Sequence, residues 1–168
     1  EVRHLAHEPV SGVVREGLWQ RIEAIFGAIG WDVVRLKFGA LQRAAFAEPG
    51  GERLRDWIDA CPNALYSALT FQGGAAWRRR LMDEIGDQGP VTALIERRSD
   101  AELQELMTNL GGHCIASLAE AFDAVDHDRP VAFLAYTIKG WNTPLAGHKD
   151  NHAGLMTRDQ MAAFQRQV

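Results

Sequence analysis

Hydrophobic residues recur at helical spacing near the start of the chain, and a strand pattern follows them. The stripe has the spacing i, i+4, i+7, i+8 and i+11 and consists of Leu18, Ile22, Ile25, Phe26 and Ile29. Gly30 is the expected C-cap residue of this helix, because glycine readily adopts the left-handed conformation that ends helices. Residues 32–38 form a short run that contains the β-branched Val33 and Val34, and this predicts a strand. A helix, a glycine and a strand in this order form half of an α/β unit.

Apolar spacing between residues 40 and 98 predicts several helices that proline and glycine interrupt. Three faces follow one another: Leu54, Trp57, Ile58 and Cys61 before Pro62; Leu65, Tyr66 and Leu69 after Asn63; and Trp77, Leu81 and Ile85 after Gly73-Gly74. Proline cannot continue the first of these helices, and Asn63 is the expected N-cap of the second.

The rest of the chain adds helices, one apolar strand and a long polar loop. A helix opened by the Ser99–Glu102 capping box is expected first, then a turn at 111–113 and a helix carrying Ile115, Leu118 and Phe122. A strand at 131–138 and a loop at 139–154 follow. The last expected element is a helix capped at Thr157, with Met156 and Met161 as its hydrophobic staple. The strand is apolar at nearly every position, which is typical of a parallel strand covered on both faces.

Two strands are fewer than an α/β domain needs. A two-stranded parallel sheet flanked by helices does not form a self-sufficient core, so we expect further strands from elsewhere in the same polypeptide or from a partner. The chain also opens on Glu1-Val2-Arg3, without an initiator methionine or a signal peptide. The sequence therefore predicts a helix-rich piece of a larger α/β domain, with part of an open parallel sheet flanked by helices.

The composition is that of a folded protein with a slight acidic excess. Of 168 residues, 46% are hydrophobic and 24% are charged, which argues against a disordered or fibrous chain. The formal charge of −4 argues against a nucleic-acid surface, and no apolar run approaches the roughly 20 residues of a membrane helix. Cys61 and Cys114 lie far apart in the sequence, which suits a reducing cytoplasm.

The loop after the second strand concentrates titratable side chains. Ligands of open α/β sheets bind beyond the carboxyl ends of the strands, so this loop is the first place to look for a site. Lys139 could hold a carboxylate or phosphate there, or it could be a solvated lysine. His148, Asp150 and His152 could bind zinc, although a loop enforces no geometry. Histidines that transfer protons from a mobile loop are the alternative.

The other histidines and a basic run have more ordinary interpretations. His113 either satisfies backbone groups of its turn or acts as a ligand, and the sequence leaves both open. His4 and His7 are expected at the surface, and His127 is expected to be solvated within an acidic turn. The run Arg78-Arg79-Arg80 is expected on a solvated helix face.

Several short motifs, taken in order, resemble a known enzyme family. The chain carries Gly30-Trp31-Asp32-Val33-Val34, then Tyr66 and Gly73-Gly74, then Leu110-Gly111-Gly112-His113, then Thr137-Ile138-Lys139-Gly140-Trp141. This order resembles the thiamine diphosphate-dependent transketolase-like enzymes, and most closely the homodimeric decarboxylating first component of bacterial pyruvate dehydrogenase complexes. The resemblance implies that residues 1–168 form the second half of the domain that binds the diphosphate of the cofactor, with a helical insertion at about 40–98.

The resemblance also implies which residues face the cofactor. Lys139 and His113 would contact thiamine diphosphate, and Lys139 would face the substrate-derived part of the intermediate. Cys114 stands where the family has an aspartate after glycine and histidine. The family's magnesium-binding motif is absent from this sequence, so magnesium ligands are expected outside the chain.

The loop at 147–156 resembles a mobile active-site loop of the same family. By this resemblance, Lys149 and His152 would take part in catalysis together with Lys139, with His152 as a general acid or base. His148 and Asn151 of the same loop would bind the substrate. No metal ligand is assigned within the chain.

The function implied by the resemblance is the decarboxylation of a 2-oxo acid and transfer of the acyl group. The expected partners are the 2-oxo acid, the remainder of the same enzyme, a second copy in a homodimer and an acyltransferase component of a multienzyme complex. One alternative is transketolase-type transfer of two-carbon units between sugar phosphates. The others are a non-catalytic α/β module whose polar loop binds a partner protein and, less favoured, a zinc-binding module.

Overall fold

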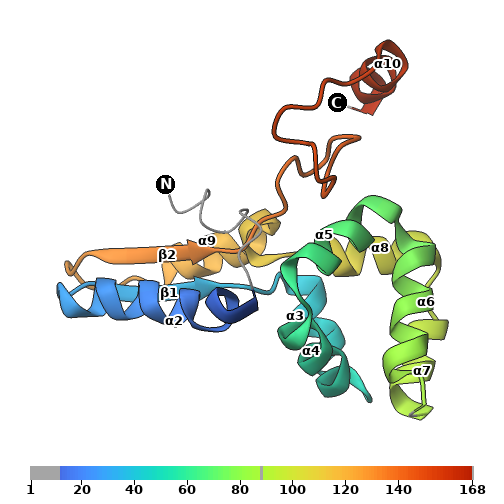
Figure 1. The fold of residues 1–168 in the computed structure, drawn as a ribbon. Helices are drawn as coiled ribbons and strands as arrows, with labels where there is room; N and C mark the ends of the chain where they lie inside the picture. Colours follow the sequence, from blue (N-terminus) through green and yellow to red (C-terminus); the bar gives the residue numbers. More distant parts are fainter. Residues whose placement is uncertain (1–11, 88, 168) are drawn as a thin grey trace. The chain divides into compact units, whose positions relative to one another are not determined.

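A computed structural model describes residues 12–87 and 89–167 of the chain (Figure 1). The chain divides into two compact units, and each is described by itself. Among the described residues, the first unit comprises 12–43 and 109–137, and the second comprises 44–87, 89–108 and 138–167. His4 and His7 lie outside the described residues.

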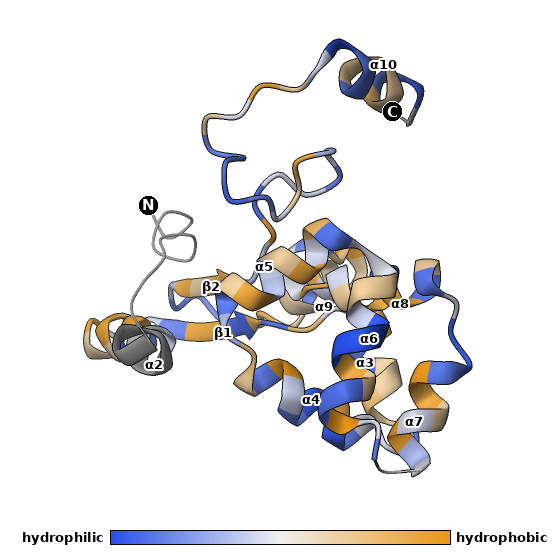
Figure 2. Ribbon diagram, turned by 45° about the vertical axis from the view of Figure 1, so that its right-hand side comes forward, coloured by the Kyte–Doolittle hydropathy of each residue, from blue (hydrophilic) through white to orange (hydrophobic). Residues whose placement is uncertain are grey.

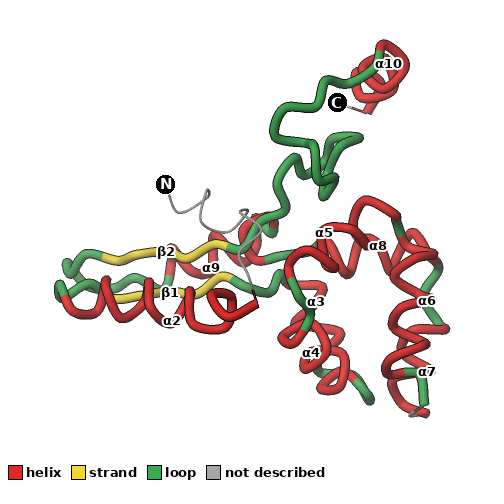
Figure 3. The backbone as a smooth tube through the Cα atoms, viewed as in Figure 1, coloured by secondary structure: helices red, strands yellow, loops and turns green. Residues whose placement is uncertain are grey.

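The first unit, the sheet unit, is built on two parallel strands. Strand β1 (Asp32–Leu36) pairs with β2 (Val131–Ala135), with Asp32 opposite Val131 and Leu36 opposite Ala135. Helices α2 (Gly12–Ala28) and α9 (Ile115–Asp123) both pack against β1 (Figure 3). A short 3-10 helix, η1 (Gly111–His113), precedes α9. The predicted parallel pairing is confirmed. Both strands end earlier than the predicted 32–38 and 131–138.

The first predicted helix and its end are confirmed. Gly30 has a φ of +80°, the left-handed conformation expected after a helix. The amide of Trp31 donates to the carbonyl of Phe26 at 3.0 Å, and the two aromatic rings lie 5.4 Å apart. This hydrophobic contact across the helix end directs the chain from α2 into β1.

The sheet unit leaves much of its apolar surface open. Leu134 and Ala132 of β2 are buried, but Ile115 and Phe122 of α9 keep 77% and 58% of their surface exposed. Across the described residues, the sheet has two strands and is not closed. The predicted fold class, a helix-rich and incomplete α/β structure, is therefore confirmed.

The second unit, the helical unit, is a bundle of short helices. Its elements are α4 (Gly51–Ala60), α5 (Asn63–Gln72), α6 (Gly74–Ile85), α7 (Gly89–Glu96), α8 (Asp100–Thr108) and α10 (Arg158–Gln167), and α3 (Ala40–Phe46) begins in the sheet unit and ends in this one. Figure 2 shows hydrophobic and hydrophilic residues alternating along these helices. The predicted faces are largely confirmed, with Leu54, Trp57, Ile58, Leu69, Trp77, Leu81 and Ile85 buried.

The two predicted capping boxes form as expected. The Ser99 hydroxyl accepts from the amide of Glu102 at 3.2 Å, and the Glu102 carboxylate accepts from the amide of Ser99 at 2.7 Å. Thr157 and Gln160 make the same reciprocal pair at 3.2 and 2.9 Å. The expectation for Asn63 is wrong, because this residue is already helical and Pro62 precedes the helix without a side-chain cap.

Two residues expected to be solvated make specific contacts, although His127 is exposed as expected. Arg78 donates to the Asp100 carboxylate at 2.6 Å and to the carbonyl of Ile95 at 3.0 Å, so it ties α6 to the start of α8. In the sheet unit, His127 Nε2 lies 3.0 Å from a carboxylate oxygen of Asp32. Sequence spacing does not reveal either contact, because the acidic partner lies far away in the sequence in both cases.

Candidate functional site

The Gly111-Gly112-His113 turn crosses the carboxyl ends of both strands of the sheet unit. The amide of Gly111 donates to the carbonyl of Lys37, just after β1, and that of Gly112 donates to the carbonyl of Tyr136, just after β2; both distances are 2.9 Å. A Cβ atom at Gly112 would lie 2.6 Å from the same Tyr136 oxygen. Because only glycine fits this approach, the turn sets His113 at the edge of the sheet where ligands of α/β folds bind.

Cys114 follows this turn and precedes α9. Its sulfur accepts a hydrogen bond from the amide of Ala40 at 3.3 Å. Burial raises the pKa of the Cys114 thiol, but hydrogen bonds from the Ser117 hydroxyl and from the amides of Ala40, Ser117 and Ala116 outweigh it, so the pKa is lowered. Cys114 therefore ionises more readily than an ordinary cysteine, at the position where the resembling family has an acidic residue.

The polar loop of the helical unit brings Lys139 and His152 together. Lys139 Nζ lies 2.5 Å from His152 Nδ1, although the two residues are 13 positions apart. A lysine ammonium has donors but no acceptor, so Nδ1 of the ring must accept in this pair. A neutral imidazole that accepts at Nδ1 carries its proton on Nε2, and the His152 side chain is exposed. The pair therefore offers an Nε2–H donor backed by a cation.

Backbone and side-chain hydrogen bonds close the loop on Lys139. The Lys139 carbonyl accepts from the Asn151 side-chain amide at 2.7 Å and from the amide of Gly147 at 3.3 Å. The hydroxyl of Thr143 donates to the carbonyl of Gly140 at 2.6 Å. These bonds fold the segment back so that His152 reaches the lysine.

Helix α5 is the surface on which this loop rests. Gly147 has a φ of +75°, and a Cβ atom there would overlap the carbonyl oxygen of Ser67. The rings of Phe71 and His148 meet edge to face with centroids 4.5 Å apart. Helical spacing does not reveal this role of α5, and its one sign is the aromatic Phe71 at an exposed helix position.

Comparison with known proteins gives two relatives and no matching protein-family profile. The chain is 30% identical over 125 residues to the pyruvate dehydrogenase E1 component of Mycobacterium tuberculosis, which covers 73% of the chain and 13% of the relative. It is 26% identical over 143 residues to that of Haemophilus influenzae, which covers 84% of the chain and 15% of the relative. The chain is similar to a segment of the pyruvate dehydrogenase E1 component.

The resemblance drawn from the short motifs is thereby confirmed. The chain spans about one seventh of the length of the E1 relatives that it matches. Its similarity to enzymes supports a common origin with 2-oxo acid dehydrogenases.

Lys149, His148 and His113, which are also predicted for the E1-like site, make contacts of their own. Lys149 is 85% exposed at its side chain and pairs with Asp150, with Nζ and the carboxylate 3.6 Å apart. His148 Nδ1 accepts from the amide of Asp150 at 3.1 Å. His113 belongs to the sheet unit and is described there. The roles assigned to these residues stay predictions.

The described residues do not fit the magnesium ion that the E1 resemblance implies. Among residues 12–87 and 89–167, no group of three or more His, Cys, Asp or Glu side chains could hold a metal ion. Magnesium requires several oxygen ligands in octahedral geometry, and Asp32 is engaged by Arg129 at 2.8 Å. His148, Asp150 and His152 do not form such a group either.

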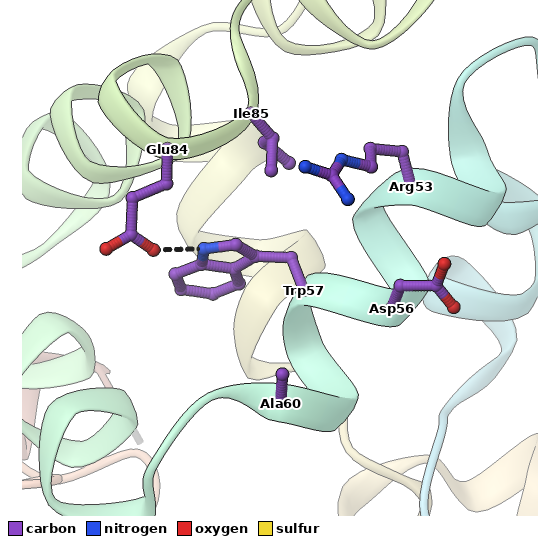
Figure 4. Close-up of a pocket in the computed structure, with 6 residues that line it drawn as sticks. All are labelled: Arg53, Asp56, Trp57, Ala60, Glu84 and Ile85. Carbon is purple, nitrogen blue, oxygen red and sulfur yellow. Dashed lines mark hydrogen bonds between the residues drawn. The ribbon is translucent and has the colours of Figure 1, made fainter.

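A cavity of about 500 Å³ lies elsewhere in the helical unit, between α4 and α6. It is lined by Arg53, Asp56, Trp57, Ala60, Glu84 and Ile85 (Figure 4). The indole N–H of Trp57 donates to the Glu84 carboxylate at 2.5 Å. None of the residues predicted for the E1-like site lines this cavity, so the loop remains the candidate site.

Proposed function

We propose that the protein is a 2-oxo acid dehydrogenase of the pyruvate dehydrogenase E1 kind, and that this chain contributes its proton-transferring loop. The observation that carries the proposal is the 2.5 Å contact between Lys139 Nζ and His152 Nδ1 in a chain similar to E1. Thiamine diphosphate and magnesium are the proposed cofactors, with magnesium ligands outside the described residues. The proposed substrate is pyruvate or another 2-oxo acid.

In this proposal, the pair delivers one proton to the reacting substrate. The Nε2–H bond of His152 breaks as its proton passes to a substrate atom that gains negative charge. Nδ1 of the same ring takes a proton from the Lys139 ammonium, so the imidazole stays neutral and the lysine becomes an amine. Before transfer, the ammonium stabilises negative charge near the ring. Positioned proton transfer of this kind accelerates reactions by about 10²–10⁴-fold.

The proposed setting is that of the E1 relatives. The partners would be the remainder of the same enzyme, a second copy in a homodimer and an acyltransferase that accepts the acyl group, and the proposed location is the cytoplasm. Across residues 12–87 and 89–167, no helix is long and apolar enough to cross a membrane.

Dye reduction by the complete polypeptide tests the proposal. Turnover of pyruvate or another 2-oxo acid should require thiamine diphosphate and magnesium. Lys139→Ala and His152→Ala should each lower kcat by about 10²-fold or more, whereas Arg79→Ala, at an exposed position of α6, should leave it unchanged.

Three outcomes would contradict the proposal. Two-carbon transfer between sugar phosphates without turnover of any oxo acid would favour transketolase-type chemistry. Oxo acid turnover that survives both loop substitutions would exclude the pair as the proton donor. Absence of both activities would favour a non-catalytic module.

A further inference from the structure

We infer that Asn151 is a positioning residue, which holds the Lys139–His152 pair together through its side-chain amide. The inference rests on the proposed function for its kinetic consequence, but not for its geometry. Asn151 Nδ2 donates to the carbonyl of Lys139 at 2.7 Å. Because His152 is the next residue, this bond ties the backbone at both members of the pair.

The contact lies on the inner side of the loop. Asn151 is partly buried, whereas His152 is exposed. A Cβ atom at Gly140 would lie 3.2 Å from Asn151 Nδ2 and be tighter than an ordinary contact, so the amide packs closely against this turn. The Asn151 amide is therefore engaged with Lys139. To bind substrate, as the sequence-based assignment requires, the same amide would have to point out of the loop.

The amide of Asn151 is the stronger of two donors that close the loop. The Lys139 carbonyl also accepts from the amide of Gly147, but that distance is 3.3 Å, at the long end of backbone hydrogen bonds. A closed loop loses conformational entropy that its contacts must offset. Loss of the 2.7 Å bond should therefore let the segment open and separate Nζ from Nδ1.

The variant Asn151→Asp tests the inference with almost no change of shape. Its carboxylate cannot donate, and it faces a carbonyl oxygen that carries partial negative charge. Asn63→Asp is the matched control, because it makes the same chemical change at an exposed first position of α5. Asn151→Gln is the conservative variant, which keeps the donor on a longer side chain.

The first measurement is ¹⁵N NMR of the histidine rings in the chain. In the unmodified protein, the His152 signals should show an unprotonated Nδ1 and a protonated Nε2. Asn151→Asp should shift them towards a mixture of both tautomers, Asn151→Gln should restore part of the original pattern, and Asn63→Asp should change nothing. His152 signals that stay unchanged in Asn151→Asp would overturn the inference.

The second measurement is oxo acid turnover by the complete polypeptide. Asn151→Asp should lower kcat by about ten- to a hundredfold with KM nearly unchanged, because a displaced catalytic group slows chemistry rather than binding. A raised KM with unchanged kcat would make Asn151 a substrate contact and overturn the inference. If the unmodified protein turns over no oxo acid, the proposed function fails, while the NMR result still decides the role of Asn151.

Discussion

The helical unit and the sheet unit bury their apolar residues to different degrees. In the helical unit, the side chains of Leu54, Trp77, Leu81, Val91, Leu94, Ile95, Leu103 and Met107 are fully buried. In the sheet unit, Ile25, Ile29, Ile115 and Phe122 keep more than half of their surface exposed. Helices that follow one another in sequence can enclose a core through local contacts, whereas a parallel sheet needs further strands and helices to cover it.

The two units also position their candidate chemistry differently. The sheet unit uses backbone amides of Gly111 and Gly112, which join both strand ends and leave little freedom to the turn. The helical unit uses side chains of a long loop, where the Asn151 side-chain amide donates to the Lys139 carbonyl and the Lys139 ammonium contacts His152. One short chain thus supports its candidate chemistry in two ways, by backbone amides at a turn and by side-chain contacts within a loop.

The largest expected effect comes from Trp77 in the core of the helical unit. This side chain is fully buried and meets the rings of Tyr66 and Trp57 edge to face, with centroids 4.8 and 6.1 Å away. Trp77→Ala should lower the free energy of unfolding by about 3–5 kcal/mol, because it leaves a large cavity. Urea unfolding followed by circular dichroism measures this change.

Ile115 of α9 provides the contrasting substitution in the sheet unit. It is 77% exposed, so Ile115→Ala should change the stability by less than about 0.5 kcal/mol. Equal losses for Trp77→Ala and Ile115→Ala would show that the exposed face of α9 is covered in solution, and the contrast between the units would be lost.

An effect smaller than that of Trp77→Ala is expected at the turn of the sheet unit. Gly112→Ala places a Cβ atom 2.6 Å from the Tyr136 carbonyl oxygen and from a methyl group of Thr137. The overpacking should destabilise the chain by about 1–3 kcal/mol and perturb the His113 signals in NMR. Gly27→Ala is the matched control, since nothing lies within 4 Å of its Cβ position, and alanine there should stabilise α2 by up to about 1 kcal/mol. A neutral Gly112→Ala would mean that the turn does not require glycine.

Local patterns in the sequence predicted the elements of this fold well. The helix faces around Leu54 and Trp77 and both capping boxes depend on residues at most a few turns apart, so spacing alone revealed them. Helix α7 (Gly89–Glu96) was not separated from its neighbours, although Gly86 and the Gly89-Pro90 pair mark its boundary. The predicted strands extend too far. The backbone amides of Gly111 and Gly112, about 75 residues after Leu36, bind the chain just after β1 and β2, and spacing within a strand does not reveal such a contact.

The candidate site was predictable only in part. The predicted strand before Lys139 and the dense loop after it directed attention to residues 139–154, and the family resemblance singled out Lys139 and His152. Their contact could not follow from spacing, since it depends on how Asn151 and Gly147 fold the loop back. The catalytic and binding roles of these residues stay predictions until turnover is measured.

The smallest expected effect is a difference between the two capping boxes of the helical unit in how their contribution to stability depends on pH. Hydrogen bonds from Ser99 hold the pKa of the exposed Glu102 carboxyl below its usual value, and the bond from the Ser99 hydroxyl contributes more than the bond from its backbone amide. Because the pKa is lower in the folded state, the stabilisation is complete above the ordinary glutamate pKa of about 4.3 and is lost as the pH falls through the folded-state value.

Glu102→Gln should therefore be less stable than the unmodified chain at neutral pH, and the difference should shrink in acid. The Thr157–Gln160 box contains no carboxylate, so the small loss caused by Gln160→Ala should be the same at neutral and acidic pH. Thermal unfolding at a series of pH values from 3 to 7 compares the two variants. A Glu102→Gln difference that is constant over this range would mean that shape, rather than charge, makes the Ser99–Glu102 box effective.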